Sequence, residues 1–486
     1  MRNGRGCASR LDEGAPLAQR ERLARLEQPD RGMKVAIVGG GWAGMAAAVT
    51  AAGGGHRVTV FEAARRPGGR ARALPVTLPD GQAAMLDNGQ HILIGAYRET
   101  LRLMRRVGVA EEQALLRLPL ALAFADGSGL ALRRSGTPRA LLAALATARG
   151  WDWRDKLALL RFIAAWRRRG FRCAEPLTVA ELGAPLTPRL RRDFLEPLCI
   201  AALNTPVTGA SGRVLLRVLH DSLWAGRGGS DLLLPRVDLG ALFPNPAARW
   251  LRANGGELRC GERVTALRPL PAAGRAPRWQ IGETGFDRVV LATPPSDAAN
   301  VLAGSTLLAP EYIASSMRRW TDIALALRYE AIATVFAMVS QAAPRTEARA
   351  APVAPAMPDA GATLPRAMLA LRAATGAAPG AQFVFDRGRL GGPPGLLAFV
   401  ASACSSERAA LQTAVAEQAR TQLGLDVQPV QTVLEKRATF ACSPGLARPP
   451  AQIAPGLLAC GDYVAGPYPA TLEAAVRSGV AAAGLL

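Results

Sequence analysis

Lysine is nearly absent from this chain of 486 residues, with only Lys34, Lys156 and Lys436, so arginine supplies most of its net charge of +21. Such a charge usually points to nucleic acid or an anionic membrane as a partner. The arginine bias, together with abundant Ala and Gly, is instead typical of a GC-rich coding sequence. No zinc-finger, helix-turn-helix or aromatic-basic RNA motif accompanies the charge. We therefore expect no nucleic-acid partner, whereas the positive charge is still compatible with attraction to an anionic membrane surface.

Paired cysteines and clustered histidines are also lacking. Seven scattered cysteines, an odd number, form no Cys-x-x-Cys pair, which argues against a disulfide framework and against a zinc site. The three histidines, His56, His91 and His220, stand too far apart in the sequence to propose a metal cluster. We expect no metal, and a reducing cytoplasm as the compartment.

Long apolar runs are missing too: none reaches the roughly 18 residues that a membrane-spanning helix needs. The mean hydropathy is +0.11. We expect a protein that does not cross a bilayer but rests on the inner face of the cytoplasmic membrane. Residues 151–171 predict a helix with an apolar set at Leu157, Leu160, Ile163 and Ala164, to which Phe162 and Trp166 add bulk, and with several arginines. Such a helix either lies among anionic headgroups or is a core helix with a solvated face.

The first 32 residues are polar and arginine-rich, without the apolar core of a signal peptide. Their acidic residues also disfavour a transit peptide. Met33 leads directly into a predicted strand, so we expect translation to start there; the alternative is a disordered tail at 1–32.

A βαβ unit follows at "KVAIVGGGWAGMAAAVTAAGGGHRVTVFE". Its Gly39-x-Gly41-x-x-Gly44 motif lies between strand and helix, as dinucleotide binding requires. Gly39 permits the tight turn, Gly41 lets the backbone approach a diphosphate, and Gly44 allows close packing. The helix start favours that anion. Glu62, ending the second strand, is placed to bind the adenosine ribose and disfavours NADP.

Downstream, "RRPGGRARA" places a flexible turn and the Arg70 guanidinium near the diphosphate. With the Gly-rich motif, it resembles the N-terminal signature of the FAD-dependent amine oxidase and phytoene desaturase superfamily, and "LLACGDYVAGPYPATLEAAVRSG" resembles its C-terminal flavin signature. The resemblance implies FAD as the cofactor and a Rossmann-like α/β domain of the glutathione-reductase type. The cofactor-binding residues that motif and resemblance together indicate are Gly39, Gly41, Gly44, Glu62, Gly69, Arg70, Val264, Gly461, Asp462, Thr471, Leu472 and Glu473.

A narrower resemblance lies in "LDNGQHILIGAYRETLRLMRRVG", "EPLCIAALNTP" and "EKRATF", which are similar to the hydroxysqualene dehydroxylases, squalene-associated FAD enzymes. Two positions depart from the family pattern: Ala474 replaces a usual glycine, and "YEAIATVFA" replaces a more usual Tyr-Glu-Pro-Ile. The flavin site is therefore better indicated than the substrate pocket.

Strands of similar buried character recur at the start, middle and end of the chain, which predicts one FAD-binding domain built from three pieces. These pieces are 33–109, 225–300 and 445–486. A mixed α+β substrate domain would comprise 110–224 and 301–444, with an Ala/Pro-rich insertion at 341–380.

The narrower resemblance implies removal of the allylic hydroxyl of hydroxysqualene to give squalene, by hydride transfer from N5 of reduced flavin to an allylic cation. His91 or Asp87 would supply a proton to the departing hydroxyl. Both also have a structural interpretation, because Asp87-Asn88-Gly89 makes a natural turn and His91 can bond the backbone. Core packing is the expected role of Asn204, Thr205, Tyr329 and Tyr463.

No second Gly-x-Gly-x-x-Gly follows a strand, so the sequence indicates no NADPH site and no electron donor. Two alternatives stay open. A desaturase of carotenoid precursors would run the opposite redox reaction, whereas a prenyl-lipid carrier of the same fold would do no chemistry. The full set of flavin motifs argues against the carrier.

Overall fold

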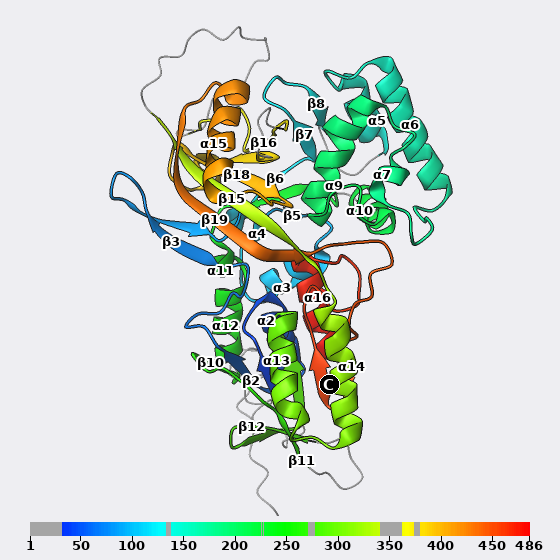
Figure 1. Ribbon diagram of the computed structural model, residues 1–486. Coiled ribbons are helices and arrows are strands. Elements are labelled where there is room, and N and C mark those ends of the chain that lie inside the picture. Colours follow the sequence, from blue (N-terminus) through cyan, green and yellow to red (C-terminus); the bar gives the residue numbers. More distant parts are fainter. Residues whose placement is uncertain are drawn as a thin grey trace, which may run out of the picture.

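The computed structural model describes residues 32–132, 138–224, 226, 228–270, 278–340, 362–373 and 380–486. The expectations for residues 1–31, and for most of the insertion at 341–380, therefore lie outside the described residues. The described chain forms two lobes, one around a mainly parallel sheet and one around an antiparallel sheet (Figure 1).

The parallel sheet joins strands from three distant parts of the chain, as the sequence predicts. Its order is β10 (Glu257–Cys260), β2 (Arg57–Glu62), β1 (Lys34–Val38), β14 (Arg288–Leu291), β21 (Leu457–Ala459) and β20 (Gln452–Ala454). Only β20 runs antiparallel to its neighbour. Val38 pairs with Phe61, so the glycine turn after β1 and the end of β2 meet at one edge of the sheet.

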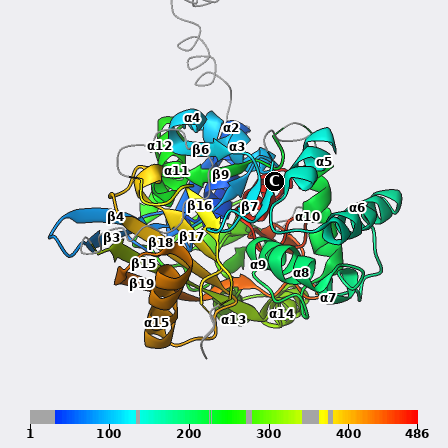
Figure 2. The same ribbon diagram turned by 90° about the horizontal axis from the view of Figure 1, so that it is seen from above.

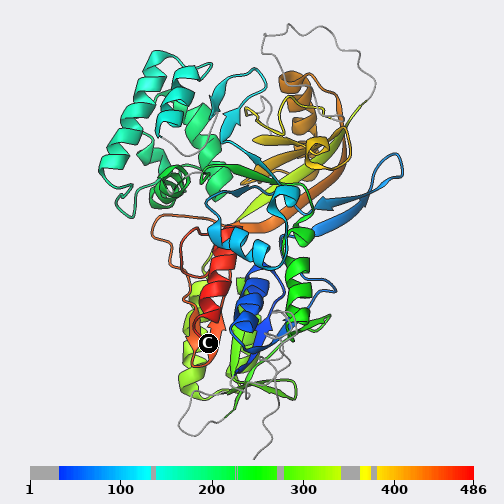
Figure 3. The same cartoon turned by 180° about the vertical axis from the view of Figure 1, so that it is seen from behind.

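Both faces of this sheet are covered, because alternate side chains of β1 enter different cores. Val35 and Ile37 pack with helix α2 (Trp42–Gly53), whereas Ala36 and Val38 join the core on the other face. Helix α16 (Leu472–Ala483) lies along α2, and Figure 3 shows the two side by side. Gly479 makes this possible, since a Cβ there would lie 2.2 Å from Ala43 O.

Further helices complete the lower lobe. The α2 side carries α3 (Arg98–Arg106) and α12 (Pro244–Ala253), and the opposite side carries α13 (Pro295–Thr306), α14 (Glu311–Leu325) and the small sheet of β11 (Arg268–Leu270), β12 (Arg278–Ile281) and β13 (Thr284–Phe286). The Trp320 indole on α14 donates to Pro450 O at 2.8 Å. We therefore propose that the domain boundary predicted near residue 301 lies after α14.

The upper lobe is built on a five-stranded antiparallel sheet. Its order is β16 (Met368–Ala370), β17 (Phe383–Asp386), β18 (Leu396–Ser402), β15 (Tyr329–Val339) and β19 (Val427–Phe440). One face is covered by α15 (Arg408–Gln418). The smaller elements nearby are β3 (Ala73–Thr77), β4 (Ala83–Asp87), β5 (Leu93–Ile94), α4 (Glu111–Ala114), β6 (Leu115–Leu118), β7 (Ala121–Ala123), β8 (Gly129–Ala131), β9 (Leu232–Pro235) and α11 (Leu239–Leu242).

A group of helices stands beside this sheet, on the side away from the β3–β4 hairpin (Figure 2). It comprises α5 (Pro138–Thr147), α6 (Trp153–Arg168), α7 (Val179–Leu182), α8 (Pro188–Leu190), α9 (Glu196–Leu203) and α10 (Gly212–Trp224). In α6 the fully buried apolar side chains are Leu159, Phe162 and Trp166, while Ala164 is exposed. Phe162 and Trp166 are thus buried as apolar residues of this helix, Leu160 and Ile163 are partly buried, and Leu159 rather than Ala164 completes the face that packs inside the protein.

Candidate functional site

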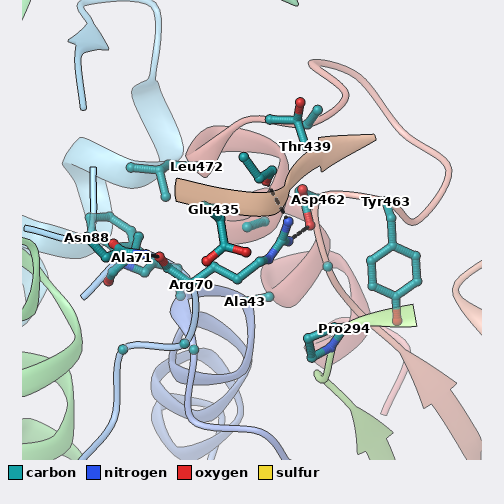
Figure 4. A pocket seen from close by; sticks show the side chains of 18 of the residues that line it. Ala43, Arg70, Ala71, Asn88, Pro294, Glu435, Thr439, Asp462, Tyr463 and Leu472 are labelled. Carbon is teal, nitrogen blue, oxygen red and sulfur yellow. Dashed lines mark hydrogen bonds and ion pairs between the residues drawn. The ribbon is translucent and has the colours of Figure 1, made fainter. Parts of the chain in front are cut away.

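A cavity of about 750 Å³ opens between the two lobes, at the edge where β1 and β2 end. The turns after β1, β2 and β14 form one side, and further walls come from residues 88–92 and 262–265, from α9, from strands of the upper sheet including β19, and from the start of α16. All the predicted cofactor-binding residues border it except Gly44 and Glu473. Figure 4 shows Arg70, Asp462 and Leu472 around this space.

The glycine turn has the geometry that its spacing predicts. Gly39 has φ of +113°, a left-handed conformation that favours glycine. A Cβ on Gly44 would lie 1.9 Å from Gly39 O and 3.0 Å from the Ala292 side chain. Gly44 thus lets α2 pack against the turn, and it acts through the fold rather than by touching a ligand.

Gly41 and Gly69 form a cradle at the start of α2. Residues 41 and 68 pair as a short parallel bridge, and Gly68 N donates to Gly40 O at 3.0 Å. A Cβ on Gly69, whose φ is +64°, would lie 3.1 Å from Gly41 Cα. No side chain caps the start of α2, so its backbone N–H groups face the cavity. This arrangement fits the diphosphate of a dinucleotide.

Glu62 borders the cavity while holding the glycine turn. Its carboxylate accepts from Gly40 N at 2.6 Å and from Ala64 N at 2.7 Å. Its backbone oxygen accepts from Glu262 N at 3.1 Å, which brings Val264 to the same wall. The Glu62 side chain thus has a structural role, and its binding of the adenosine ribose stays a prediction.

Arg70 and Asp462 form an ion pair, although 392 positions separate them. The guanidinium also donates to Ala438 O at 2.9 Å, which ties the lower lobe to β19. The nearby Asp462 carboxylate raises the pKa of Arg70, and Glu435 adds to this effect. Figure 4 places Glu435 beside Arg70. The pair fixes a positive charge where motif reasoning places the diphosphate.

Sequence reasoning missed the part of this wall that β19 provides, namely Glu435, Ala438 and Thr439. The only signal was "EKRATF", which carries the family resemblance without indicating a role for any residue. It also missed Thr293, whose buried Oγ1 has no hydrogen-bond partner in the described part of the chain and which borders the cavity.

The N-terminus of α16 meets the cavity at Thr471 and Leu472. Thr471 Oγ1 accepts from Ala474 N at 3.1 Å and so caps the helix. Ala474 itself is buried, so the fold accommodates this departure from the family pattern. The positive end of the helix dipole is directed at the site, where it stabilises negative charge on a bound cofactor.

Glu473 lies elsewhere, and we no longer propose it as a cofactor contact. Its side chain is fully buried and accepts from Glu99 N at 3.1 Å, Thr100 N at 3.0 Å and Thr100 Oγ1 at 2.7 Å. Arg477 Nε donates to it at 2.7 Å. A residue next to Leu472 on a helix points in a different direction, and Glu473 points at the start of α3. It joins α16 to α3.

His91 borders the cavity, with its Nδ1 2.7 Å from Gly89 O. Because a carbonyl only accepts, Nδ1 carries the hydrogen. Burial lowers the pKa of His91, and the Arg70 charge lowers it further, despite the bond to Gly89. At neutral pH the ring is therefore uncharged and offers an acceptor at Nε2. This geometry disfavours the predicted role of His91 as proton donor.

Asp87, the other predicted proton donor, does not border the cavity. It is 4% exposed, and its Oδ1 accepts from Leu239 N at 2.9 Å at the start of α11. Burial raises the pKa of Asp87 to about 6, against the effects of the Leu239 bond and of Arg387; Asp238 raises it further. Asp87 thus positions the segment before His91, and we no longer propose it as a catalytic acid.

This raised pKa predicts a pH-dependent stability. The folded protein holds the Asp87 proton from the ordinary value of 3.8 up to about 6, so its stability falls as the pH rises through this window. Between pH 4.5 and 7.5 the free energy of unfolding should fall by about 2 kcal/mol more in the wild type than in Asp87→Asn. Urea unfolding of both proteins at several pH values measures it. The same dependence of stability on pH in both proteins would contradict the raised pKa of Asp87. A loss of all turnover in Asp87→Asn would instead indicate a catalytic role for Asp87.

The expected core residues Asn204, Thr205 and Tyr463 all have protein partners. Asn204 Nδ2 donates to Thr439 Oγ1 at 2.8 Å, and its Oδ1 accepts from Ala403 N at 2.7 Å. Thr205 Oγ1 accepts from Cys442 N at 3.1 Å, and Tyr463 donates to Thr293 O at 3.1 Å. These bonds hold the segment after α9 against the ends of β18 and β19, and they join the turn after β21 to the turn after β14.

A second cavity of about 210 Å³ adjoins the first and is mostly apolar. It lies among α6, α9 and α10, and its walls include Leu159, Phe162 and Trp166 of α6. The residues common to both cavities are Ile92, Tyr97, Ala201, Ala202, Phe383 and Thr471. The predicted cofactor site therefore continues into space suited to a hydrocarbon chain.

The chain is similar to curated proteins named hydroxysqualene dehydroxylase. That of Zymomonas mobilis is 26% identical over 468 residues, which cover 92% of this chain and 98% of the relative. That of Rhodopseudomonas palustris is 29% identical over 56% of this chain and 64% of the relative.

Among solved structures, an oxidoreductase of Methanosarcina mazei has the same fold, with a TM-score of 0.64. It is 15% identical, and the match covers 93% of this chain and all of the other. The family model described as flavin containing amine oxidoreductase matches residues 42–486. With the cradle of Gly41 and Gly69 and the ion pair of Arg70, this match shows that the chain belongs to the flavin-containing amine oxidoreductases and is an FAD-dependent oxidoreductase.

Proposed function

We propose that the enzyme reductively removes the hydroxyl group of hydroxysqualene and releases squalene. The observation that carries this proposal is the similarity to the Zymomonas mobilis hydroxysqualene dehydroxylase, which extends over nearly the whole of both chains. The apolar cavity joined to the predicted FAD site supports it, because a triterpene alcohol needs a water-poor space beside the cofactor.

We further propose how the chain holds FAD. The cradle and the α2 N-terminus bind the diphosphate, and the α16 N-terminus meets the flavin ring. Arg70, fixed by Asp462, keeps positive charge beside the anion. The residues assigned to direct contact are Gly39, Gly41, Glu62, Gly69, Arg70, Val264, Gly461, Asp462, Thr471 and Leu472.

In the proposed reaction the alcohol takes up one proton and one hydride, its C–O bond breaks, and squalene and water are released. Bound FAD in its reduced form supplies the hydride. The apolar walls exclude water, which would otherwise capture an allylic cation and return the alcohol. An external electron donor has to reduce FAD again for the next turnover.

An anaerobic assay tests this function. Holoprotein reduced with dithionite is incubated with hydroxysqualene, and the extracted lipids are separated and identified. We expect squalene from the complete reaction and unchanged alcohol from protein left oxidised. Recovery of the alcohol from the reduced protein would contradict the proposal.

A carotenoid desaturase is the second candidate. The relatives that favour it include the hydroxyneurosporene desaturase of Rhodobacter capsulatus, 43% identical but over only 20% of this chain. Such an enzyme would oxidise phytoene or ζ-carotene with oxidised FAD, so the same assay run in that direction separates the two candidates. The lipid carrier is not proposed again, since the chain belongs to a family of oxidoreductases.

We also propose that the enzyme contacts the inner membrane surface through the outward face of α6. No helix in the described ranges is long and apolar enough to span a bilayer. The inner face of α6 borders the second cavity, and Trp153 on the outer side of this helix is 68% exposed. The outward arginines are Arg154, Arg161, Arg167, Arg168 and Arg169. Their charge complements anionic headgroups.

Vesicle sedimentation checks this contact. The combined variant Arg161→Glu, Arg167→Glu and Arg168→Glu should bind phosphatidylglycerol vesicles at least about tenfold more weakly than the wild type. A variant with the same charge change in the lower lobe, Arg249→Glu, Arg252→Glu and Arg268→Glu, serves as the control. Equal binding by the α6 variant and the control would refute the proposed face.

A further inference from the structure

The second cavity has one polar end in an otherwise apolar lining. Hydroxyl and carboxyl groups gather there from α10, from the turn before β9 and from the loop before α16. These residues are Asp221, Ser222, Ser230, Tyr468 and Thr471. A hydrocarbon alone would not need such groups, so their partners decide what this end can bind.

The second feature of this end is the hydroxyl group of Ser230, which is buried. The residue is 1% exposed, and Oγ has no hydrogen-bond partner within the described ranges of the chain. A buried hydroxyl without a partner is costly and uncommon in folded proteins. Because Ser230 borders the cavity, a ligand with one polar group can supply the missing partner.

The backbone fixes Ser230 in this place. Gly229 lies so close to the end of α10 that a Cβ on it would be 3.1 Å from Ser222 O and 3.3 Å from Asp221 O. Gly229 O also accepts from Ala96 N at 2.9 Å. The turn is therefore held between α10 and the segment that leads into α3, which fixes the backbone that carries Ser230.

Tyr468 provides the second polar atom and is held in a strained conformation. Its φ is +57°, unusual for a tyrosine, and such strain gathers at functional sites. The hydroxyl donates to Asp221 Oδ2 at 2.6 Å, and His220 Nδ1 lies 2.7 Å from Asp221 Oδ1. Its hydrogen is directed to Asp221 and Arg217 also hydrogen-bonds to the tyrosine oxygen, so that oxygen keeps one lone pair to accept from a ligand.

The charge at this end favours a neutral ligand. Although burial raises the pKa of Asp221, hydrogen bonds from Tyr468, Arg217 and His220 bring it below its ordinary value. The carboxylate is thus ionised at neutral pH and disfavours a second anion, such as a diphosphate. Arg217 pairs with Asp221, and Arg477 with Glu473.

We propose that this end of the second cavity binds the hydroxyl group of an isoprenoid alcohol. Ser230 Oγ donates to the alcohol oxygen, and the Tyr468 oxygen accepts its hydrogen. Thr471, which belongs to this end, also borders the first cavity, so the carbinol carbon lies toward the flavin site while the hydrocarbon chain follows the apolar wall of α6. The inference rests on the proposed function, because it takes its ligand class from there.

Binding to oxidised holoprotein, in which no turnover occurs, tests this assignment. Hydroxysqualene and squalene are titrated against the wild type and Ser230→Ala, with the flavin spectrum or tryptophan fluorescence as readout. Ser230→Ala should weaken hydroxysqualene binding about five- to tenfold and leave squalene binding within about twofold. Tyr468→Phe should act in the same direction, and Ser230→Thr should keep most of the alcohol affinity.

The outcomes separate this inference from the proposed function. Unchanged alcohol affinity in Ser230→Ala, or an equal loss for both ligands, would overturn the inference even if the wild type makes squalene. Selective loss of alcohol affinity would support it, even if the reduced wild type makes none and the proposed function fails. Ser230→Ala removes no hydrogen bond, so its melting temperature should equal or exceed that of the wild type.

Discussion

Gly41→Ala should give a folded protein that purifies with little flavin. A Cβ on Gly41 would have only Gly69 nearby, 3.6 Å away at Cα, which is an ordinary contact. The fold therefore tolerates the methyl group, but it occupies the cradle that we assign to the diphosphate. We expect FAD affinity to fall by at least about tenfold, with a melting temperature of the apoprotein close to that of the wild-type apoprotein.

Two other glycines provide the comparison. Gly285→Ala, on β13 and away from the cavity, should retain full flavin, since a Cβ there meets only ordinary contacts at 3.7 Å and beyond. Gly44→Ala should instead damage the fold, because its Cβ would lie 1.9 Å from Gly39 O. Flavin absorbance per protein and thermal unfolding distinguish these effects. Normal flavin content in Gly41→Ala would show that the diphosphate lies elsewhere.

Glu473→Ala should cost about 3–5 kcal/mol of the free energy of unfolding. The fully buried carboxylate accepts four hydrogen bonds, and its loss leaves the α3 N-terminus and Arg477 without this partner. Chemical denaturation of the apoprotein measures this cost directly. Glu311→Ala is the control, since that carboxylate also stands in the first turn of a helix but is 79% exposed.

The same variant separates a structural role from a cofactor role. Glu473→Gln keeps one acceptor oxygen and should lose less stability than Glu473→Ala. If Glu473 touched the flavin, as motif matching predicts, Glu473→Gln would lose flavin without a comparable loss of stability. We expect the reverse, because the side chain points at α3 and not into the cavity.

The nucleotide-binding half was predictable from the sequence because its requirements are local. A glycine turn, a close helix and an acidic strand end are encoded within some thirty residues. Gly39, with φ of +113°, and Gly44 have the geometry that their spacing predicts, and Glu62 ends the second strand, while ribose binding by Glu62 stays a prediction. The three-piece sheet followed from the buried character of its strands.

The substrate side was less predictable because it depends on contacts between distant segments. Asp87 was expected to be catalytic from its place near His91, yet it bonds Leu239, 152 positions away. Ser230 belongs to no motif, and the C-terminal flavin signature contains Tyr468 without indicating a role for it, so only the fold brings the two residues to one cavity. In α6 the sequence indicates Phe162 and Trp166 as apolar residues but not Leu159, which packing buries while Ala164 stays exposed.

A single anaerobic turnover in D₂O tests the central claim most directly. Protein with fully reduced FAD is mixed with excess hydroxysqualene, and flavin oxidation is followed while the product is analysed by mass. We predict one squalene for each flavin oxidised, carrying one deuterium at the former alcohol carbon, because the hydride of reduced flavin exchanges with solvent. Flavin that stays reduced, or squalene without deuterium, would contradict it.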